Sequence, residues 1–200
     1  MNFDFSEDQK FLGNEARKFL ESECPMTAVR LVLNDDDVSH NADVWKKVVE
    51  MGWLGTAIPE EHGGLGLGLL EVCVLAEEMG RVLAPVPWAS TVYFFTEALK
   101  IAGSSEQQAD VLPRIVSGDV VGCYAASEGP GNPTAANLKT TFDGSTLSGT
   151  KLPVTDGDVA THAVVLAKEG SGASLVLVDL TGEGVTRKTL QTLDPTRSHA

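Results

Sequence analysis

The sequence has few of the residues that mark disulfide-rich or metal-binding proteins. Its 200 residues include only three cysteines, Cys24, Cys73 and Cys123, which are far apart and form no CxxC pair. Their number and spacing exclude a disulfide framework and a zinc ribbon, and they favour a reducing compartment. None of the four histidines has another histidine three or four positions away, so the sequence predicts no metal site.

Basic charge is also scarce. The chain carries 15 Lys and Arg against 28 Asp and Glu, which gives a formal net charge of −13. Nucleic acids and anionic membrane surfaces attract a basic face, so we expect neither as a partner. A small molecule that bears phosphate stays compatible with this charge, because a few local cations or backbone N–H groups are enough to bind it.

Export signals and long apolar runs are missing as well. No apolar run reaches the roughly 18 residues of a membrane span. Acids such as Asp4 and Glu7 stand near the N-terminus, where a signal peptide has basic residues. We therefore expect a cytoplasmic protein without a membrane span. The hydrophobic content of 42% predicts a packed core and not a disordered chain.

Up to residue 118 the apolar residues recur at helical spacing. Helices are predicted from Ser6 to about residue 24 and over 42–51, 69–79, 91–102 and 105–117, the last with Ser105 and Gln108 as a capping box. Residues 30–41 are mixed, and their acidic run predicts a solvated loop. The first part of the chain is therefore predicted to be an all-α bundle, assigned to residues 1–118.

From residue 119 the pattern becomes strand-like. Asp143-Gly144 predicts a hairpin between strands at 138–142 and 146–154, and Gly170 lies in a second hairpin between 163–167 and 174–180. A last strand is predicted over 185–193. The fold class is thus α+β and multidomain, with an antiparallel β-barrel over residues 119–200. No closing helix follows the predicted sheet, so we expect a further domain.

The junction between these two parts is the first candidate for a ligand site. The apolar run 120–126 ends at Ser127 and Glu128 and opens into a Gly/Pro loop over 129–133. A strand that ends this way brings backbone close to a flat or anionic ligand, and clefts at such junctions commonly bind ligands.

A hydrolase triad can also be assembled from residue types near the end of the chain. Asp194, Ser198 and His199 supply them, but there is no G-x-S-x-G elbow, and adjacent Ser and His side chains rarely face each other. The glycine-rich run 64–68 lies between predicted helices, where glycines set a turn more often than they hold a phosphate. We therefore interpret both features as structural.

Several short motifs follow one another in the order found in one enzyme family. They are Pro59-Glu60-x-x-Gly63-Gly64, Glu77-Glu78-x-Gly80-Arg81, Leu112-Pro113, Ser117-Gly118, Ala125-Ala126-Ser127-Glu128 and Leu147-x-Gly149-x-Lys151. Each motif alone is weak, but together they are specific, because they follow in one order from residue 59 to residue 151. On these residues the chain resembles the acyl-CoA dehydrogenase family.

The resemblance implies a fold, a cofactor and a reaction. Family members have a helical domain, a β-barrel and a third, helical bundle, with FAD between the barrel and that bundle. The reaction implied is α,β-desaturation of an acyl-CoA thioester, with electrons passed to an acceptor protein, in a homo- or hetero-oligomer. The family's catalytic Glu belongs to the third domain, so no catalytic residue is assigned in this chain.

The resemblance also implies cofactor- and substrate-binding positions. Tyr124, Ala126 and Ser127 match the strand beside the flavin ring, Pro153 stands where the family has a Trp against the ring, and Thr155 matches a flavin-contacting Thr. Without the resemblance, Ser127 and Thr155 are an ordinary strand-end hydroxyl and an ordinary strand residue.

The loop that follows matches a segment that touches flavin and the pantetheine arm of CoA. In this sequence its residues are Gly131, Asn132 and Pro133. Pro133 has neither an N–H nor a hydroxyl to donate, and Pro153 offers less area than Trp. Both departures weaken the expectation of tight flavin binding by this chain alone.

Three functions stay open at this point. The first is an FAD-dependent acyl-CoA dehydrogenase whose catalytic bundle lies outside these 200 residues, so that the chain alone is inactive. The second is a non-catalytic partner subunit of a heteromeric acyl-CoA dehydrogenase. The third is a flavin oxidase or monooxygenase on the same fold. The acyl group is not readable, although the altered loop 129–134 and the segment 194–197 are similar to those of family branches that handle bulky or steroid-derived CoA esters.

Overall fold

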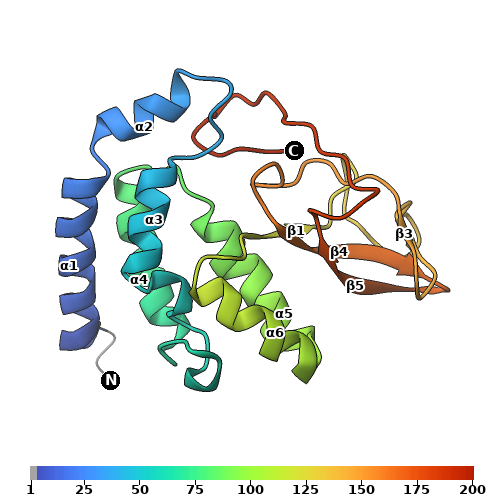
Figure 1. Cartoon of the computed structure of the whole chain (residues 1–200), viewed down its shortest axis with the longest axis horizontal. Coiled ribbons are helices and arrows are strands. Elements are labelled where there is room, and N and C mark those ends of the chain that lie inside the picture. Colours follow the sequence, from blue (N-terminus) through green and yellow to red (C-terminus); the bar gives the residue numbers. More distant parts are fainter. Residues whose placement is uncertain (1–3) are drawn as a thin grey trace.

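The protein consists of a helical part followed by a sheet (Figure 1), and the computed structural model describes residues 4–200. The helical elements are α1 (Glu7–Glu23), α2 (Met26–Leu33), α3 (Ala42–Glu50), the 3₁₀ turns η1 (Trp53–Gly55) and η2 (Glu60–His62), α4 (Leu69–Arg81), the π-helical η3 (Ser90–Thr96), α5 (Glu97–Ala102) and α6 (Ser105–Val116). The strands are β1 (Gly122–Ala125), β2 (Thr141–Phe142), β3 (Leu147–Ser148), β4 (His162–Glu169) and β5 (Gly172–Asp179).

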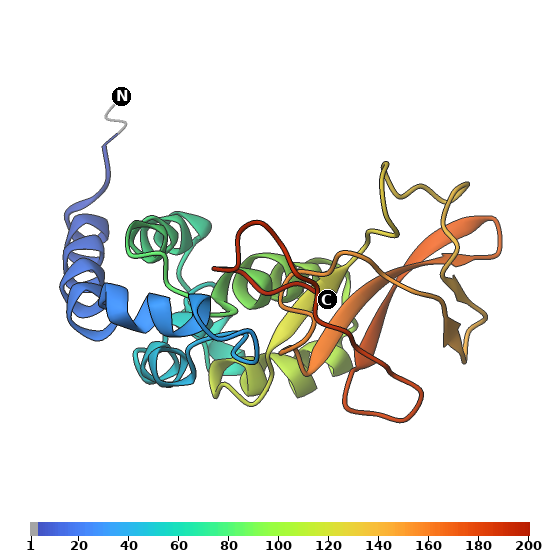
Figure 2. The same cartoon turned by 90° about the horizontal axis from the view of Figure 1, so that it is seen from above.

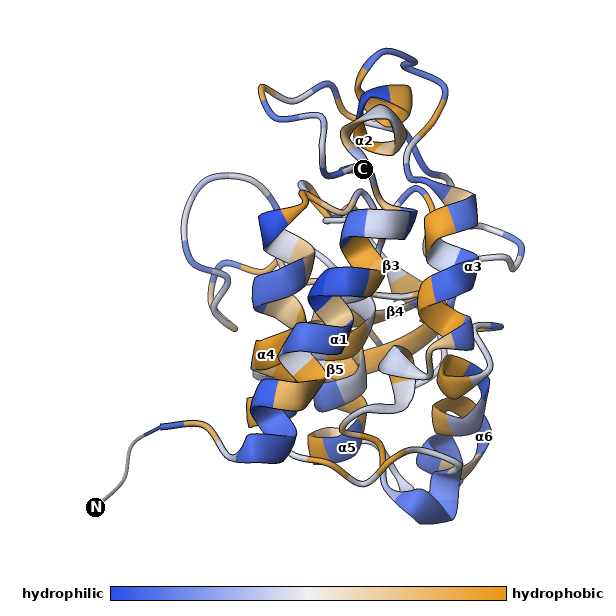
Figure 3. Ribbon diagram, turned by 90° about the vertical axis from the view of Figure 1, so that its left-hand side faces the viewer, coloured by the Kyte–Doolittle hydropathy of each residue, from blue (hydrophilic) through white to orange (hydrophobic). Residues whose placement is uncertain are grey.

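Helix α1 starts where the sequence predicts. The Ser6 hydroxyl accepts from Gln9 N at 3.2 Å, and Gln9 Oε1 accepts from Ser6 N at 2.9 Å, which completes a capping box. Helix α1 is bonded to α4, because Arg17 of α1 donates two hydrogen bonds to the carboxylate of Glu78, at 2.7 and 2.9 Å. The outer side of α1 is largely hydrophilic (Figure 3), as expected of a helix that covers a core.

Two details of the helical part differ from the sequence prediction. Helix α2 begins directly after Pro25, so residues 30–33 are helical and the loop is shorter than expected. Proline has no N–H to contribute to α1, yet its φ suits the start of the next helix. The capping box of α6 lies one residue earlier than predicted, on Ser104 and Gln107. Pro113 lies within α6 without ending it.

The helical part is followed by a sheet as expected, but the sheet is mixed, so the expectation of an antiparallel arrangement was wrong. The strand order is β1-β4-β2-β3, and β5 also pairs with β4, outside this order. Strand β4 is antiparallel to β5 but parallel to both β1 and β2. The two predicted hairpins force antiparallel pairs, whereas β1 reaches β4 through a long connection, which permits a parallel pair.

The last strand predicted from the sequence does not form. Residues 185–193 contain no strand, and nearly all their side chains are exposed, whereas a strand in a sheet buries one face. The chain then turns back from the sheet towards the helices (Figure 2). There Val154 and Ala200 exchange two backbone hydrogen bonds, at 2.7 and 2.9 Å. Among residues 4–200, no helix is long and apolar enough to cross a membrane.

The core of the helical part extends onto one face of the sheet. Val164 is buried in the large helical cluster and Tyr124 packs against it, whereas Cys123 and Ala125 belong to a smaller cluster on the opposite face. Alternation along β1 therefore separates its two faces. At Gly122 a Cβ would lie 2.1 Å from Cγ of Phe95, so β1 starts directly against η3. A division of the chain at residue 118 stays a prediction.

Candidate functional site

The end of β1 and the segment 152–155 lie side by side. Leu152 N donates to Ser127 O, and Gly129 N donates to Leu152 O, both at 2.8 Å. These bonds form an isolated parallel bridge between Glu128 and Leu152. Two stretches that the sequence singled out, the strand end at Ser127 and the segment that starts at Pro153, are thereby brought together. We call this pair of stretches the strand-end edge.

The strand-end edge is partly open to solvent. Tyr124, Ala126, Ser127 and Thr155 are half-buried, and Pro153 is exposed. The Ser127 hydroxyl donates to the carbonyl of Gly129 at 3.2 Å, so its lone pairs can still accept. This local bond is the one expected of an ordinary strand-end hydroxyl. It leaves the strand-end edge partly open to solvent.

The loop residues Gly131, Asn132 and Pro133 are all exposed. Gly131 has a φ of +106°, which only glycine adopts easily. Asn137 orders the loop, because its Nδ2 donates to Asn132 O at 2.8 Å. In the described chain no hydrogen bond joins these three loop residues to the strand-end edge.

Glu128 is the residue at this edge that the sequence analysis missed, since it gave Glu128 no role beyond its place in a motif. Its carboxylate accepts from Lys139 N at 2.7 Å, Thr140 N at 2.8 Å and Lys151 Nζ at 2.8 Å. Lys151 also donates to Ala126 O at 3.2 Å. The glutamate thus ties three segments of the edge together. The signal in the sequence for this contact was Lys151 of the Leu-x-Gly-x-Lys motif, because its charge is opposite to that of Glu128.

The electrostatics of Glu128 follow from these contacts. Burial raises the pKa of its carboxyl, but the hydrogen bonds from Lys151 and from Thr140 and Lys139 outweigh burial and lower the pKa to about 2. The side chains of Glu128 and Lys151 are only 12% and 8% exposed. A charged pair that is this well bonded has a structural role at neutral pH, so Glu128 is not a group that exchanges protons there.

An apolar groove of about 310 Å³ lies beside β1. It runs along η3 and α5 and reaches Tyr124 of β1 and Leu175 of β5. Phe94 is 56% exposed and Ile101 is 81% exposed, although both are large apolar residues. Glu97, the acid of this groove, is paired with Lys100 at 2.6 Å. Exposed apolar side chains gathered in one groove mark a candidate surface for an apolar ligand or for another protein surface.

The hydrolase triad is not assembled. The hydroxyl of Ser198 donates to Asp158 at 2.7 Å, and the Nδ1 of His199 is 3.1 Å from the carbonyl of Arg197. Asp194 accepts from Thr196. In the part of the chain that the structure describes, no group of three or more His, Cys, Asp or Glu residues could hold a metal ion.

A helical unit packed on a mixed sheet, with a polar strand end beside an apolar groove, places this chain among the α+β proteins. The family profile of the acyl-CoA dehydrogenase N-terminal domain matches residues 6–119. FadE27, an acyl-CoA dehydrogenase of Mycobacterium tuberculosis, is 32% identical over 96% of this chain and 51% of its own length. Acryloyl-CoA reductase (NADH) of Anaerotignum propionicum is 31% identical over 90% of this chain and 48% of its own length.

Solved structures agree with the sequence matches. The ChsE4–ChsE5 complex of Mycobacterium tuberculosis aligns with a TM-score of 0.87 at 28% identity, over 100% of this chain and 54% of that chain. The Tcur3481–Tcur3483 steroid ACAD aligns with a TM-score of 0.83 at 33% identity, over 96% of this chain and 54% of that chain. This protein belongs to the acyl-CoA dehydrogenase family, and it spans about half the length of the curated relatives that it matches.

The residues present fit a flavin edge in part. The half-buried hydroxyls of Ser127 and Thr155 are polar groups that could bond the rim of an isoalloxazine ring, and the exposed ring of Pro153 offers a small apolar surface. A Bacillus anthracis acyl-CoA dehydrogenase solved with FAD has the same fold, with a TM-score of 0.84 at 24% identity, over 98% of this chain and 35% of that chain. Pro153 itself cannot donate a hydrogen bond.

Proposed function

We propose that this chain supplies the helical and sheet portions of an FAD-dependent acyl-CoA dehydrogenase. The observation that carries the proposal is the position of the apolar groove beside the strand-end edge, with Tyr124 in both. An acyl-CoA joins an apolar chain to a polar thioester, and a flavin must lie against that thioester. A groove that runs into a polar edge suits this combination of groups.

The roles of the chain's own residues follow from this arrangement. Phe94, Ile101 and Leu175 would bury the acyl chain and so keep water from the reacting carbons. Ser127 and Thr155 would orient the cofactor at the edge. When bound, FAD would take up the hydride that leaves the β-carbon of the thioester. No residue of this chain is assigned as the base that removes the α-proton.

The test is flavin content and thioester oxidation in the assembled protein. The chain is produced together with a helical bundle of the family, joined to it or as a partner chain, and purified. We expect visible flavin absorbance and oxidation of acyl-CoA esters with a dye acceptor, with fatty and steroid-derived esters compared. An assembly with no flavin and no oxidation of any ester would refute the proposal, and oxygen consumption during turnover would indicate an oxidase or monooxygenase instead.

A non-catalytic partner subunit is the second candidate. Pro153 and Pro133 both lack the N–H that a donor to the cofactor would need, and both are exposed in the structure. The ChsE4–ChsE5 relative is a complex of two named components. Flavin stoichiometry separates the candidates: one flavin for each chain supports a catalytic subunit, and one for every two chains supports the partner role.

A further inference from the structure

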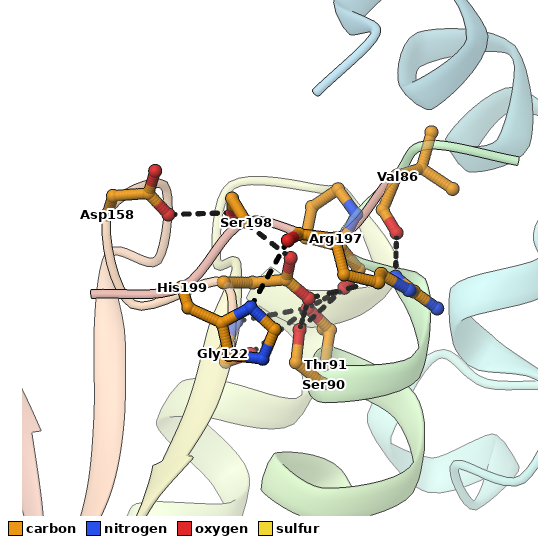
Figure 4. Close-up of polar contacts among 10 residues, drawn as sticks. Val86, Ser90, Thr91, Gly122, Asp158, Arg197, Ser198 and His199 are labelled. Carbon is orange, nitrogen blue, oxygen red and sulfur yellow. Dashed lines mark hydrogen bonds and ion pairs between the residues drawn. The ribbon is translucent and has the colours of Figure 1, made fainter. Parts of the chain in front are cut away.

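Two consecutive buried hydroxyls stand at the start of η3, the π-helical segment that carries Phe94. Ser90 and Thr91 are fully buried and lie where the helical part meets the sheet (Figure 4). Each hydroxyl makes a hydrogen bond to a residue of the sheet part. A buried hydroxyl that reaches into another part of the chain fixes the relative position of the two segments that it joins.

Ser90 joins the helix to the segment that follows Thr155. Its hydroxyl donates to Oδ2 of Asp156 at 2.7 Å. Asp156 has a left-handed backbone, with a φ of +55°, and Ser198 lies 3.3 Å from its other oxygen. Arg197 is 3.8 Å from the same carboxylate, and its guanidinium donates to the carbonyl of Val86. The residue next to Thr155 is thus held from the helical side.

Thr91 joins the same helical turn to β1. Its hydroxyl accepts from Gly122 N at 3.2 Å and lies 2.8 Å from the carbonyl of Pro87, to which it donates. Gly122 packs against Phe95 so closely that no Cβ would fit. From the end of β1 at Ala125 the chain continues to Ser127. Both stretches of the strand-end edge are therefore attached to one turn of one helix.

That helix also forms a wall of the apolar groove. It continues from Thr91 through Phe94 into α5 and Ile101. We propose that Ser90 and Thr91 are positioning residues. They set the position of the groove wall on η3–α5 relative to the strand-end edge on the sheet. The proposal rests on the proposed function, because register matters to a reaction only if the two surfaces hold reacting groups.

The hydroxyl of Thr91 can be separated from its packing by a matched pair of variants. Thr91→Val keeps the shape and loses the hydroxyl, whereas Thr91→Ser keeps the hydroxyl and loses a methyl group. In the assembled, flavin-containing protein we expect Thr91→Val to lower kcat about tenfold or more, with flavin content and KM changed much less, because a small displacement of reacting groups is costly. Thr91→Ser should stay within about twofold of the wild type.

A double-mutant cycle tests the Ser90 contact without any activity. Ser90→Ala and Asp156→Gly are combined, since glycine accepts a φ of +55° without strain. The free energies of unfolding should not be additive, so that the unfolding equilibrium constant of the double variant differs about fivefold or more from the value expected for independent sites. Thr96→Val is the control for Ser90→Ala, because the Thr96 hydroxyl is equally buried but donates within the helix, to Thr91 O at 2.8 Å. Its combination with Asp156→Gly should be additive.

The possible outcomes are distinct. If the wild-type assembly oxidises acyl-CoA and Thr91→Val matches it, or if Thr91→Ser is the impaired variant, the positioning role is refuted while the proposed function stands. An additive Ser90–Asp156 cycle also refutes it. If the wild-type assembly holds no flavin and oxidises no thioester, the proposed function fails and the positioning role fails with it, while a non-additive cycle still reports the physical contact.

Discussion

The sharpest prediction concerns Glu128 at the strand-end edge. Thr140 N and Lys151 Nζ both donate to Oε1 of Glu128, and Lys139 N donates to Oε2. The NH₂ group of Glu128→Gln faces a donor at either of these two positions, and Lys151, whose side chain is 8% exposed, loses its carboxylate partner. Removal of one member of a buried ion pair costs about 3–5 kcal/mol when the other is left unpaired. Some solvent contact remains at this pair, so we expect Glu128→Gln to lower the free energy of unfolding by about 2–4 kcal/mol.

The pKa of Glu128 gives an independent magnitude. Its fall from 4.5 to about 2 corresponds to about 3 kcal/mol of stabilisation of the charged form. The folded pKa lies below the unfolded pKa, so this stabilisation is complete above the unfolded value and is lost as the pH falls towards 2. The wild type should therefore lose its advantage over Glu128→Gln on acidification, until the two unfold alike.

The measurement is denaturant unfolding followed by tryptophan fluorescence, at neutral pH and at several acidic values. Glu77→Gln is the matched control, because the Glu77 side chain is 63% exposed and pairs with Arg81 at the surface. It should change the unfolding free energy by about 0.5 kcal/mol or less. A Glu128→Gln variant that loses under about 1 kcal/mol, or whose difference from the wild type does not shrink in acid, would show that Glu128 does not hold the edge together.

Three further predictions follow from other contacts. Gly122→Ala should destabilise the protein by about 1–3 kcal/mol through overlap with the Phe95 ring, and Phe95→Leu should recover part of the loss; additive losses in denaturant would contradict this. Glu78→Gln should cost about 1–3 kcal/mol. Because the Arg17 hydrogen bond outweighs burial and lowers the pKa of Glu78, that cost should shrink as the pH falls, and a cost that is the same in acid would refute it. Cys73 is exposed and should react with a thiol reagent in the folded protein. Burial raises the pKa of Cys123 to about 12, so Cys123 should be labelled only on unfolding. Equal labelling rates for the two thiols would contradict this.

Local signals in the sequence were sufficient for the start of α1 and for the hairpins. Ser6 with Gln9, and the turns at Asp143-Gly144 and at Gly170, satisfy backbone groups within a few residues. The direction of β1 could not be obtained in this way. A parallel pair between β1 and β4 joins residues forty positions apart, as in Gly122 with His162, and no local pattern encodes it.

By itself the sequence determined that helices precede strands, the candidate edge at Ser127 and the resemblance to a family, because short-range capping, turn chemistry and motif order are all written along the chain. Only the tertiary structure decided that the sheet is mixed and that Glu128 is a bonded anchor and not a surface acid. It also showed that Ser90 and Thr91 face the sheet. Each of these depends on partners far away in the chain, so burial and pairing, which arise only on folding, set their roles.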